Sequence, residues 1–375
     1  MRRLRMPVRP QWQRRCEAVG FDFHSLGGAY WAEGVAYEFT LAQIEHLEAV
    51  TEDLHARMLA AVEWIVANRN FEPFALPPFA VEEIERSWRR GDPSLYGRFD
   101  FSWNGRDEPR LLEYNADTPT ALLEASVVQW QWLEDLAPEA DQFNSLHEKL
   151  IARWRELAQR WPAHTRVHFA ACADHAEDQG NTAYLLDTAA QAGLRTGALC
   201  IEDIGFDARD AHFVDPNEER ITHCFKLYPW EWMVEDEFGR MLGRTRTHFI
   251  EPAWKLLLSC KAILPIIAQL NPGHPNLLPA TFDQTLAPPY VRKPRYSREG
   301  ANITLVTDSG PLSAPGPYGR EGHIYQVAAP LPEFDGRFPV IGSWVVGDQA
   351  AGMGIREDQG PITTNTSSFV PHFFL

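Results

Sequence analysis

Two strand-like segments joined by a turn carry four polar residues of the types that build metal and phosphate sites. Successive side chains alternate across a strand, so Arg98 and Asp100 share one face of the first segment. The Asn104–Gly105 turn leads into a return segment in which Glu113 and Asn115 share a face. The opposite face is apolar and is expected to pack inward, with Phe99, Phe101, Trp103, Leu112 and Tyr114. A hairpin over 96–115 would therefore present all four polar groups on one surface.

Two carboxylates and an amide oxygen form a set of hard oxygen ligands. Mg²⁺ prefers such ligands and completes its shell with waters and phosphates. Arg98 would then be placed to clamp a phosphate or a carboxylate with two parallel hydrogen bonds. The ordinary alternative is a solvated hairpin face with an Arg98–Asp100 ion pair, because alternating polar faces are common in antiparallel sheets.

The segment that follows the hairpin predicts a helix whose start could bind an anion. Thr118 is expected to cap this helix, with Pro119 at its first helical position. Free N–H groups at a helix N-terminus attract anions. A cation site beside an anion site is the combination that phosphate chemistry requires.

Two lysines occupy unusual places. Lys261 falls within the apolar stripe of a helix expected over 251–270, where a lysine must either find a partner or extend its ammonium group to solvent. Lys293 ends a strand-like segment and precedes a polar loop, 297–302. Lys261 could bind a nucleotide phosphate, and the loop after Lys293 could fold over phosphates with its backbone N–H groups as donors. A plain surface turn is an equally good interpretation for the loop.

The elements that must position these groups form a mixed α/β (α+β) chain of 375 residues. Thr40 and Gln43 form a capping box, and the apolar spacing after them predicts a long core helix ending near 68–70. Strand, helix and strand patterns between 165 and 235 predict a small α/β layer. The last part is rich in strands, expected at 290–293, 303–307, 323–327, 340–346 and 353–355, with the glycine-rich 347–354 as a tight connection.

Composition excludes several classes of protein. The net charge of −16 disfavours nucleic acid as a partner. The five cysteines show no zinc or CxxC spacing, which is typical of reduced thiols in the cytoplasm. No signal peptide is expected after the basic N-terminus, and the longest apolar stretch, 256–270, is too short and interrupted to span a membrane. Walker A, GxGxxG, HExxH and GxSxG motifs are absent.

Several motifs together resemble the synthetase domain of the glutathionylspermidine synthase family, including its stand-alone acid–amine ligases. The resemblance extends from about Gly20 to the end of the chain. The motifs are Arg98–Phe101, Leu112–Thr120, Leu122–Ala125, Leu258–Pro265, Asn271–Leu278, Lys293–Pro294, Gly342–Gly347 and Gly354–Asp358. Their common order makes the resemblance specific.

The resemblance implies an ATP-grasp fold with permuted motif order, metal ligands preceding the nucleotide lysines. Asp100, Glu113 and Asn115 would bind Mg²⁺, and Arg98 would stabilise an acyl phosphate. The implied ATP contacts are Arg98, Phe99, Asp100, Lys261, Lys293 and Gln326, the last at the adenine. The whole chain, 1–375, would be one synthetase unit with approximate parts 1–160 (N-terminal helices and metal-binding hairpin), 161–245 (substrate side) and 246–375 (nucleotide-binding part), without an amidase domain.

The function implied is an ADP-forming ligase that joins a carboxylate, glutathione or a similar peptide, to an amine such as spermidine. Thr118, Glu177 and Asp178 would contact these substrates. Glu177–Asp178 and the segment Lys226–Trp230 fall where the family contacts glutathione and the polyamine, and the surroundings of these two segments depart from the family pattern. A non-catalytic, regulatory ATP-binding protein of the same fold is the alternative. A carbohydrate-active protein is a third reading, based on the thirteen tryptophans and the many carboxylates. The residues do not identify the oligomeric state.

Overall fold

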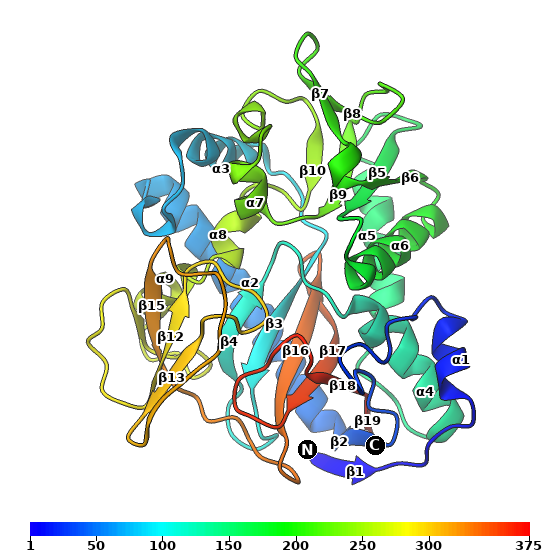
Figure 1. Cartoon of the computed structure of the whole chain (residues 1–375), viewed down its shortest axis with the longest axis vertical. Coiled ribbons are helices and arrows are strands. Elements are labelled where there is room, and N and C mark those ends of the chain that lie inside the picture. The colour runs from blue at the N-terminus through cyan, green and yellow to red at the C-terminus, as the bar shows by residue number, and fades with distance from the viewer.

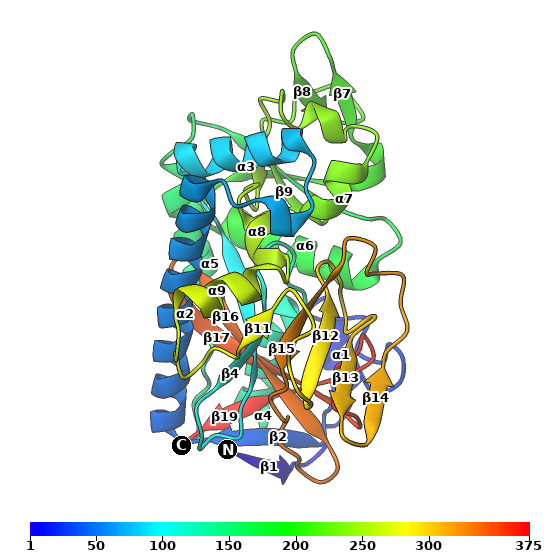
Figure 2. The same ribbon diagram turned by 90° about the vertical axis from the view of Figure 1, so that its left-hand side faces the viewer.

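The computed structural model describes every residue from Met1 to Leu375. Its longest helix, α2 (Leu41–Asn68), confirms the predicted capping box: Gln43 N donates to Thr40 Oγ1 at 3.3 Å, and Thr40 N donates to Gln43 Oε1 at 3.0 Å. The helix ends at Arg69, which adopts a left-handed conformation. Its apolar side packs against β16 (Phe338–Val346) and β17 (Gln349–Asp358) of the central sheet, and it runs along one side of the molecule in Figure 2.

The central sheet is antiparallel and contains the predicted hairpin. Its strand order is β18 (Ser368–Val370), β17 (Gln349–Asp358), β16 (Phe338–Val346), β3 (Tyr96–Ser102) and β4 (Arg110–Asn115). The hairpin and the C-terminal strands therefore share one sheet (Figure 1). Only residues 347 and 348 of the glycine-rich segment form a turn, and the rest belongs to β17.

A β-bulge in the hairpin changes one side-chain direction. Asp100 pairs with Glu113, but Phe101 pairs with Leu111, so Leu112 is the extra residue. Leu111 is consequently fully buried in the core, whereas Leu112 lines a cavity on the polar side. The expectation that Leu112 packs inward with Tyr114 is therefore wrong.

A second antiparallel sheet stands beside β4, on the side of the central sheet away from α2 (Figures 1 and 2). Two side chains of this sheet form hydrogen bonds to the backbone of β4. Lys293 Nζ donates to Leu112 O at 2.7 Å, and Gln326 Nε2 donates to Leu111 O at 3.3 Å. The strand order is β11 (Ala280–Thr281), β15 (His323–Val327), β12 (Tyr290–Pro294), β13 (Thr304–Thr307) and β14 (Gly310–Ser313). The predicted C-terminal strands are thus confirmed, divided between two sheets.

The predicted α/β layer is confirmed as a parallel sheet that packs against α6 (Ala176–Gln191), and α5 (Leu146–Ala158) packs against α6. Its strand order is β10 (His248–Ile250), β9 (His223–Leu227), β5 (Arg166–Ala171) and β6 (Arg195–Cys200). A small hairpin extends from it, with β7 (Gly205–Asp207) and β8 (His212–Val214). Figure 1 shows this layer above the central sheet.

The single helix expected over 251–270 is two short helices, α8 (Lys255–Ser259) and α9 (Ile263–Leu270). The backbone leaves the helical region at Cys260, where ψ is 129°. A proline inside a helix removes a hydrogen bond and clashes with the carbonyl four residues earlier, but it is tolerated in the first turn. The break places Pro265 in the first turn of α9 and frees Lys261, whose N–H donates to Arg295 O at 2.8 Å.

The helix expected to begin at Thr118 begins later, so that prediction is also wrong. Ala121 has a φ of 64°, and the helical segment that follows contains a π-helical turn, η2 (Glu124–Val128), before α4 (Gln129–Leu136). The N–H groups of Leu122 and Leu123 donate to Asn181 Oδ1 at 2.8 and 3.4 Å. This side chain already occupies the position that an anion would take.

The two chain termini meet in a three-stranded sheet formed by β1 (Arg2–Arg5), β2 (Val35–Phe39) and β19 (His372–Phe374) (Figure 1). The remaining elements are α1 (Trp12–Glu17), η1 (Glu72–Phe74), α3 (Pro78–Arg90), η3 (Ile201–Asp203), α7 (Trp230–Glu235) and η4 (Gly239–Met241). None of the helices combines the length and the apolar character needed to cross a membrane.

Candidate functional site

A cavity of about 660 Å³ is lined by both five-stranded sheets, by the loop after β4 and by the start of α6. Nine of the eleven residues predicted for the site line it: Arg98, Asp100, Glu113, Asn115, Thr118, Glu177, Asp178, Lys293 and Gln326. Lys261 lies directly behind Glu113. The structure thus brings together residues from three distant parts of the chain.

Phe99, like Lys261, does not line the cavity. Its side chain is fully buried on the opposite face of β3 and stacks on Tyr114, with ring centroids 3.8 Å apart. The ring therefore belongs to the core behind the metal-binding face and does not reach the cavity.

Arg98 and Asp100 form a bidentate ion pair on the cavity wall. Arg98 Nε and Nη2 donate to Asp100 Oδ1 and Oδ2 at 2.6 and 2.9 Å, and Asn115 Nδ2 donates to Asp100 Oδ2 at 2.9 Å. The pair that the alternative interpretation proposed is present, but its face is not solvated, since the two side chains are only 15% and 12% exposed. Burial raises the pKa of Asp100 even against the opposing charge of Arg98.

Glu113 is surrounded by cations. Lys261 Nζ lies 3.2 Å from Glu113 Oε2 and donates to Ser297 O at 2.8 Å. Burial alone would raise the pKa of Glu113, but the ammonium groups of Lys261 and Lys293 outweigh it and lower that pKa to about 2. Lys261 is 6% exposed, so it does not extend to solvent.

Lys293 is held in the cavity wall by its hydrogen bond to Leu112 O. Burial lowers the pKa of Lys293 to about 8, although the nearby Glu113 favours its charged form. With Arg98 and Lys261 it makes three cations beside the two carboxylates of Asp100 and Glu113. The excess positive charge favours phosphate groups in this end of the cavity.

The same wall fits Mg²⁺ by its donor chemistry. Asp100, Glu113 and Asn115 offer two carboxylates and one amide, and Mg²⁺ is usually held by one or two carboxylates together with waters and substrate phosphates. No group of three or more His, Cys, Asp or Glu side chains that could hold a metal exists anywhere in the chain. A divalent ion here would therefore depend on a phosphate-bearing ligand to complete its shell.

The neighbouring part of the cavity suits a flat apolar ring. Gln326 is 2% exposed and its amide is anchored to Leu111 O. Around it the wall is apolar, with Pro289, Val291, Leu305, Val327, Ala328 and Leu331. After Gln326 the backbone N–H of Val327 donates to Pro279 O at 2.9 Å, and that of Ala328 donates to Pro289 O at 3.1 Å.

The far end of the cavity is acidic. Glu177 and Asp178 lie in the first turn of α6, beside Asp174 and Glu299 of neighbouring loops. Burial and the charge of Glu177 raise the pKa of Asp178 to about 6. These carboxylates provide a site for positively charged groups.

Sequence reasoning missed several polar residues around the cavity. Glu124 lies fully buried beside Glu177, accepts a 2.6 Å hydrogen bond from Tyr30 Oη, and has its pKa raised to about 7, mainly by burial. Arg298 lines the cavity and donates to Thr118 Oγ1 at 2.7 Å and Glu231 Oε1 at 2.8 Å. Its position in the polar loop 297–302 was the one available signal. For Glu124 the one available signal was its place in the motif Leu122–Ala125.

Comparison with known proteins identifies a matching family model, similar sequences and a similar fold. The family model "Glutathionylspermidine synthase preATP-grasp" matches residues 3–375. A "Putative acid--amine ligase" from Haemophilus influenzae is 44% identical over 98% of this chain and 98% of that protein. The "Trypanothione synthetase" of Crithidia fasciculata is 31% identical over 83% of this chain. The "Bifunctional glutathionylspermidine synthetase/amidase" of Escherichia coli is 28% identical over 89% of it.

The chain spans 52% and 58% of the length of the last two relatives. Among solved structures, a glutathione synthetase-like effector from Globodera pallida in its apo form superimposes with a TM-score of 0.57, covering 98% of this chain and 100% of that chain. The two sequences are 10% identical, so this likeness concerns the fold alone. The family expected from the motifs is confirmed, and these sequence relatives carry the names of ligases or synthetases. The chain belongs to the glutathionylspermidine synthase family.

Proposed function

We propose that this protein is an ATP- and Mg²⁺-dependent, ADP-forming ligase that joins a carboxylate to an amine on an ATP-grasp fold with permuted motif order. One observation carries the proposal: a single cavity has a cation-rich end with a hard oxygen set and, opposite it, an acidic end. Family membership supports the same reaction class. The three parts 1–160, 161–245 and 246–375 would supply the metal ligands, the substrate side and the nucleotide side.

In this proposal each end of the cavity has its own ligand. Asp100, Glu113 and Asn115 would hold Mg²⁺, which neutralises phosphate charge when bound. Lys261 and Lys293 would bind the ATP phosphates, and Gln326 with the apolar wall around it would hold the adenine. Binding replaces the present partners of the carboxylates, so Arg98 becomes free to face the transferred phosphoryl group.

The reaction needs little covalent help from the protein. A carboxylate oxygen of the acid attacks the γ-phosphorus of ATP, the bond from that phosphorus to the β,γ-bridging oxygen breaks, and ADP leaves. The amine nitrogen then attacks the carbonyl carbon of the acyl phosphate, the carbon–oxygen bond to phosphate breaks, and the nitrogen loses a proton. Arg98 and the lysines neutralise charge that develops in the first step, and the cavity holds the reactants in line.

The substrates would be a glutathione-like peptide and a polyamine-like amine. The relatives named after trypanothione and glutathionylspermidine support this choice. The acidic end, with Glu177 and Asp178, favours a cationic amine, and Thr118 lines the same cavity. A protonated distal amine would gain from these carboxylates while the reacting nitrogen faces the phosphate end.

The test is ADP release by purified protein with Mg²⁺ and ATP, screened over γ-glutamyl peptides crossed with polyamines and amino acids. Release that requires both an acid and an amine supports the ligase and identifies its substrates. Tight ATP binding without ADP release for any pair would instead support the non-catalytic alternative. An Asp100→Asn variant is the matched control for contaminating ATPase activity.

A further inference from the structure

The loop from Asn115 to Leu122, which we call the 115–122 loop, is held by contacts at most of its positions. It connects a proposed metal ligand to the helix behind the cavity. Its anchoring contacts come from several elements: Lys255 Nζ to Ala116 O, Lys226 Nζ to Asp117, Arg298 to Thr118 Oγ1, Tyr96 Oη to Pro119 O, Arg98 Nη1 to Thr120 O, and Leu122 N to Asn181. Residues 116–121, which lie outside helix and strand, are thereby fixed in one conformation.

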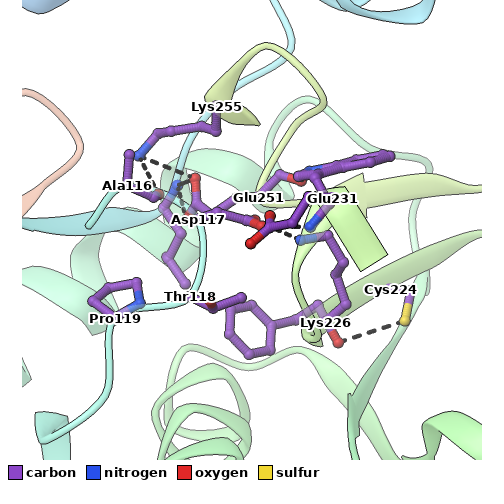
Figure 3. A network of polar contacts seen from close by, with 12 residues as sticks. Ala116, Asp117, Thr118, Pro119, Cys224, Lys226, Glu231, Glu251 and Lys255 are labelled. Atoms are coloured by element: carbon purple, nitrogen blue, oxygen red, sulfur yellow. Dashed lines mark hydrogen bonds and ion pairs between the residues drawn. The ribbon is translucent and has the colours of Figure 1, made fainter. Parts of the chain in front are cut away.

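Asp117 is the only charged residue of this loop, and it is paired inside the protein (Figure 3). Lys226 Nζ of β9 lies 2.5 Å from Asp117 Oδ1, and both side chains are 1% exposed. The other carboxylate oxygen, Oδ2, accepts the N–H of Trp230 at 2.8 Å. Lys226 Nζ also lies 5.0 Å from the centre of the Trp230 ring. The pair therefore ties the loop to the parallel sheet and to the start of α7.

A second buried pair supports the same loop. Lys255 Nζ donates to Ala116 O at 3.1 Å and to Tyr96 O at 2.8 Å, and it lies 3.4 Å from Glu251 Oε2. Glu251 Oε1 in turn accepts the N–H groups of Leu95 and Tyr96 at the start of β3. The two ends of the hairpin, at Tyr96 and Ala116, are thus fixed to one lysine.

Stability alone is a weak explanation for a buried ion pair. Desolvating both charges offsets much of their attraction, and apolar replacements of similar size are often as stable. What such a pair provides is a defined direction and distance. Here the pair fixes the position of a loop whose first residue, Asn115, is a proposed metal ligand. The Thr120 carbonyl of the same loop accepts Arg98 Nη1 at 2.7 Å and so orients its guanidinium.

We propose that Asp117 and Lys226 are positioning residues for the reaction proposed above: their buried pair fixes the 115–122 loop and so aligns Asn115 and Arg98. Neither side chain lines the cavity, so both act through the loop. The inference rests on the proposed function, because its kinetic test measures that reaction. A second test, metal-dependent nucleotide binding, does not require the reaction.

The decisive variant is the double replacement Asp117→Asn/Lys226→Met. It leaves no unpaired buried charge, it keeps an oxygen for the Trp230 N–H, and it roughly preserves volume. We expect a melting temperature close to that of the unaltered protein, kcat lower by about 10- to 100-fold, a higher Mg²⁺ concentration for half-maximal rate, and little change in the KM of the amine. The single change Lys226→Met leaves Asp117 unpaired and should also lower the melting temperature.

A second buried pair provides the matched control. Arg9 and Glu33 are 3% and 4% exposed, Glu33 Oε2 also accepts a hydrogen bond from Trp31 Nε1, and neither residue lines the cavity. The double variant Arg9→Met/Glu33→Gln should leave kcat and the Mg²⁺ requirement unchanged. Equal losses of kcat in both double variants would overturn the proposal. So would a loss in Asp117→Asn/Lys226→Met that simply follows a fall in melting temperature or a failure to fold.

Calorimetry separates this inference from the proposed function. The increase in ADP affinity caused by Mg²⁺ should be smaller in Asp117→Asn/Lys226→Met than in the unaltered protein and unchanged in the control. That comparison remains valid even if no acid–amine pair gives ADP release. An undiminished Mg²⁺ effect in the double variant contradicts the positioning role, whatever the reaction is.

Discussion

The two ends of the cavity differ in how strongly nearby cations offset the effect of burial on a carboxylate pKa. At the hairpin end, close cations lower the pKa of Glu113 to about 2, so this carboxylate stays charged at every physiological pH. At the α6 end, burial and neighbouring carboxylates raise the pKa of Asp178 to about 6 and that of Glu124 to about 7. One end is a set of compensated charges, and at the other the carboxylates of Asp174, Glu177, Asp178 and Glu299 outnumber the guanidinium groups of Arg298 and Arg356.

This difference indicates that the two ends of the cavity have different functions. Fixed, compensated charges are suited to stabilising phosphoryl transfer, because they need no rearrangement when the charge develops. Uncompensated carboxylates are suited to accepting a cation that arrives with the substrate. Changes at the two ends should therefore affect different kinetic constants.

The largest effect is expected at the hairpin end. Asp100→Asn or Glu113→Gln removes one of two carboxylates of the proposed Mg²⁺ site, and kcat should fall by about 10³-fold or more because the phosphate charge is no longer neutralised. Steady-state ADP release checks the rate, and circular dichroism melting checks that the fold is intact.

The matched variant at the acidic end is Glu177→Gln. It should raise the KM of the amine and leave kcat within a few-fold, since it removes a binding charge and not a metal ligand. Full activity in the Asp100 variant, or the same changes of kcat and KM in the variants at both ends, would contradict the assignment of different functions to the two ends.

Lys293 gives the next effect and adds a pH dependence. Its pKa of about 8 means that the ammonium group is charged below pH 8 and is lost as the pH rises through 8. The kcat/KM for ATP, which reports the free enzyme, should therefore fall above pH 8. Lys293→Met should lower it about 10²-fold at pH 7. Lys293→Arg keeps a charge at all these pH values and should abolish the alkaline fall, and a fall that persists in this variant would rule Lys293 out as its cause.

The hairpin end was also the part that the sequence predicted well. Alternation over β3 and β4 is a local pattern, and it placed Arg98, Asp100, Glu113 and Asn115 on one surface. Only the β-bulge was not predicted, because nothing in the local sequence distinguishes Leu111 from Leu112 as the residue that points into the core. The long helix α2 was equally accessible, since its cap and its apolar spacing both lie within the element.

Residues fixed by distant partners were not predictable. Lys261 was expected within a helix, but the helix breaks at Cys260 and the Lys261 N–H bonds to Arg295 O. Asp117 and Lys226 are 109 residues apart, so their pairing leaves no local trace. The high pKa of Glu124 depends on burial and on Glu177 in another helix. Contacts between residues far apart in the sequence therefore determine the position of Lys261, the Asp117–Lys226 pair and the pKa of Glu124.

At the acidic end we predict a smaller effect that depends on pH. With a pKa of about 6, Asp178 is charged above pH 6 and is neutralised as the pH falls through 6. The KM of a cationic amine should therefore rise several-fold, up to about 10-fold, between pH 7 and pH 5. Asp178→Asn should already show the higher KM at pH 7 and no further change near pH 6. An unchanged acid-side rise in that variant would assign it to another carboxylate.

The smallest effect concerns stability and involves the buried Glu124. Its carboxyl group has a pKa of about 7 in the folded chain against 4.5 for an ordinary glutamate, so the folded state binds this proton more tightly. The resulting stabilisation is complete below about pH 4.5 and is lost as the pH rises through 7. Glu124→Gln cannot ionise and keeps an oxygen for the Tyr30 hydroxyl, so it should be roughly 1–3 kcal/mol more stable than the unaltered protein at pH 8 and equal to it near pH 4.5. Urea unfolding at both pH values measures the difference. A variant that is less stable at pH 8 would mean that a cation already compensates Glu124, and the contrast between the two ends of the cavity would then be limited to residues that line it.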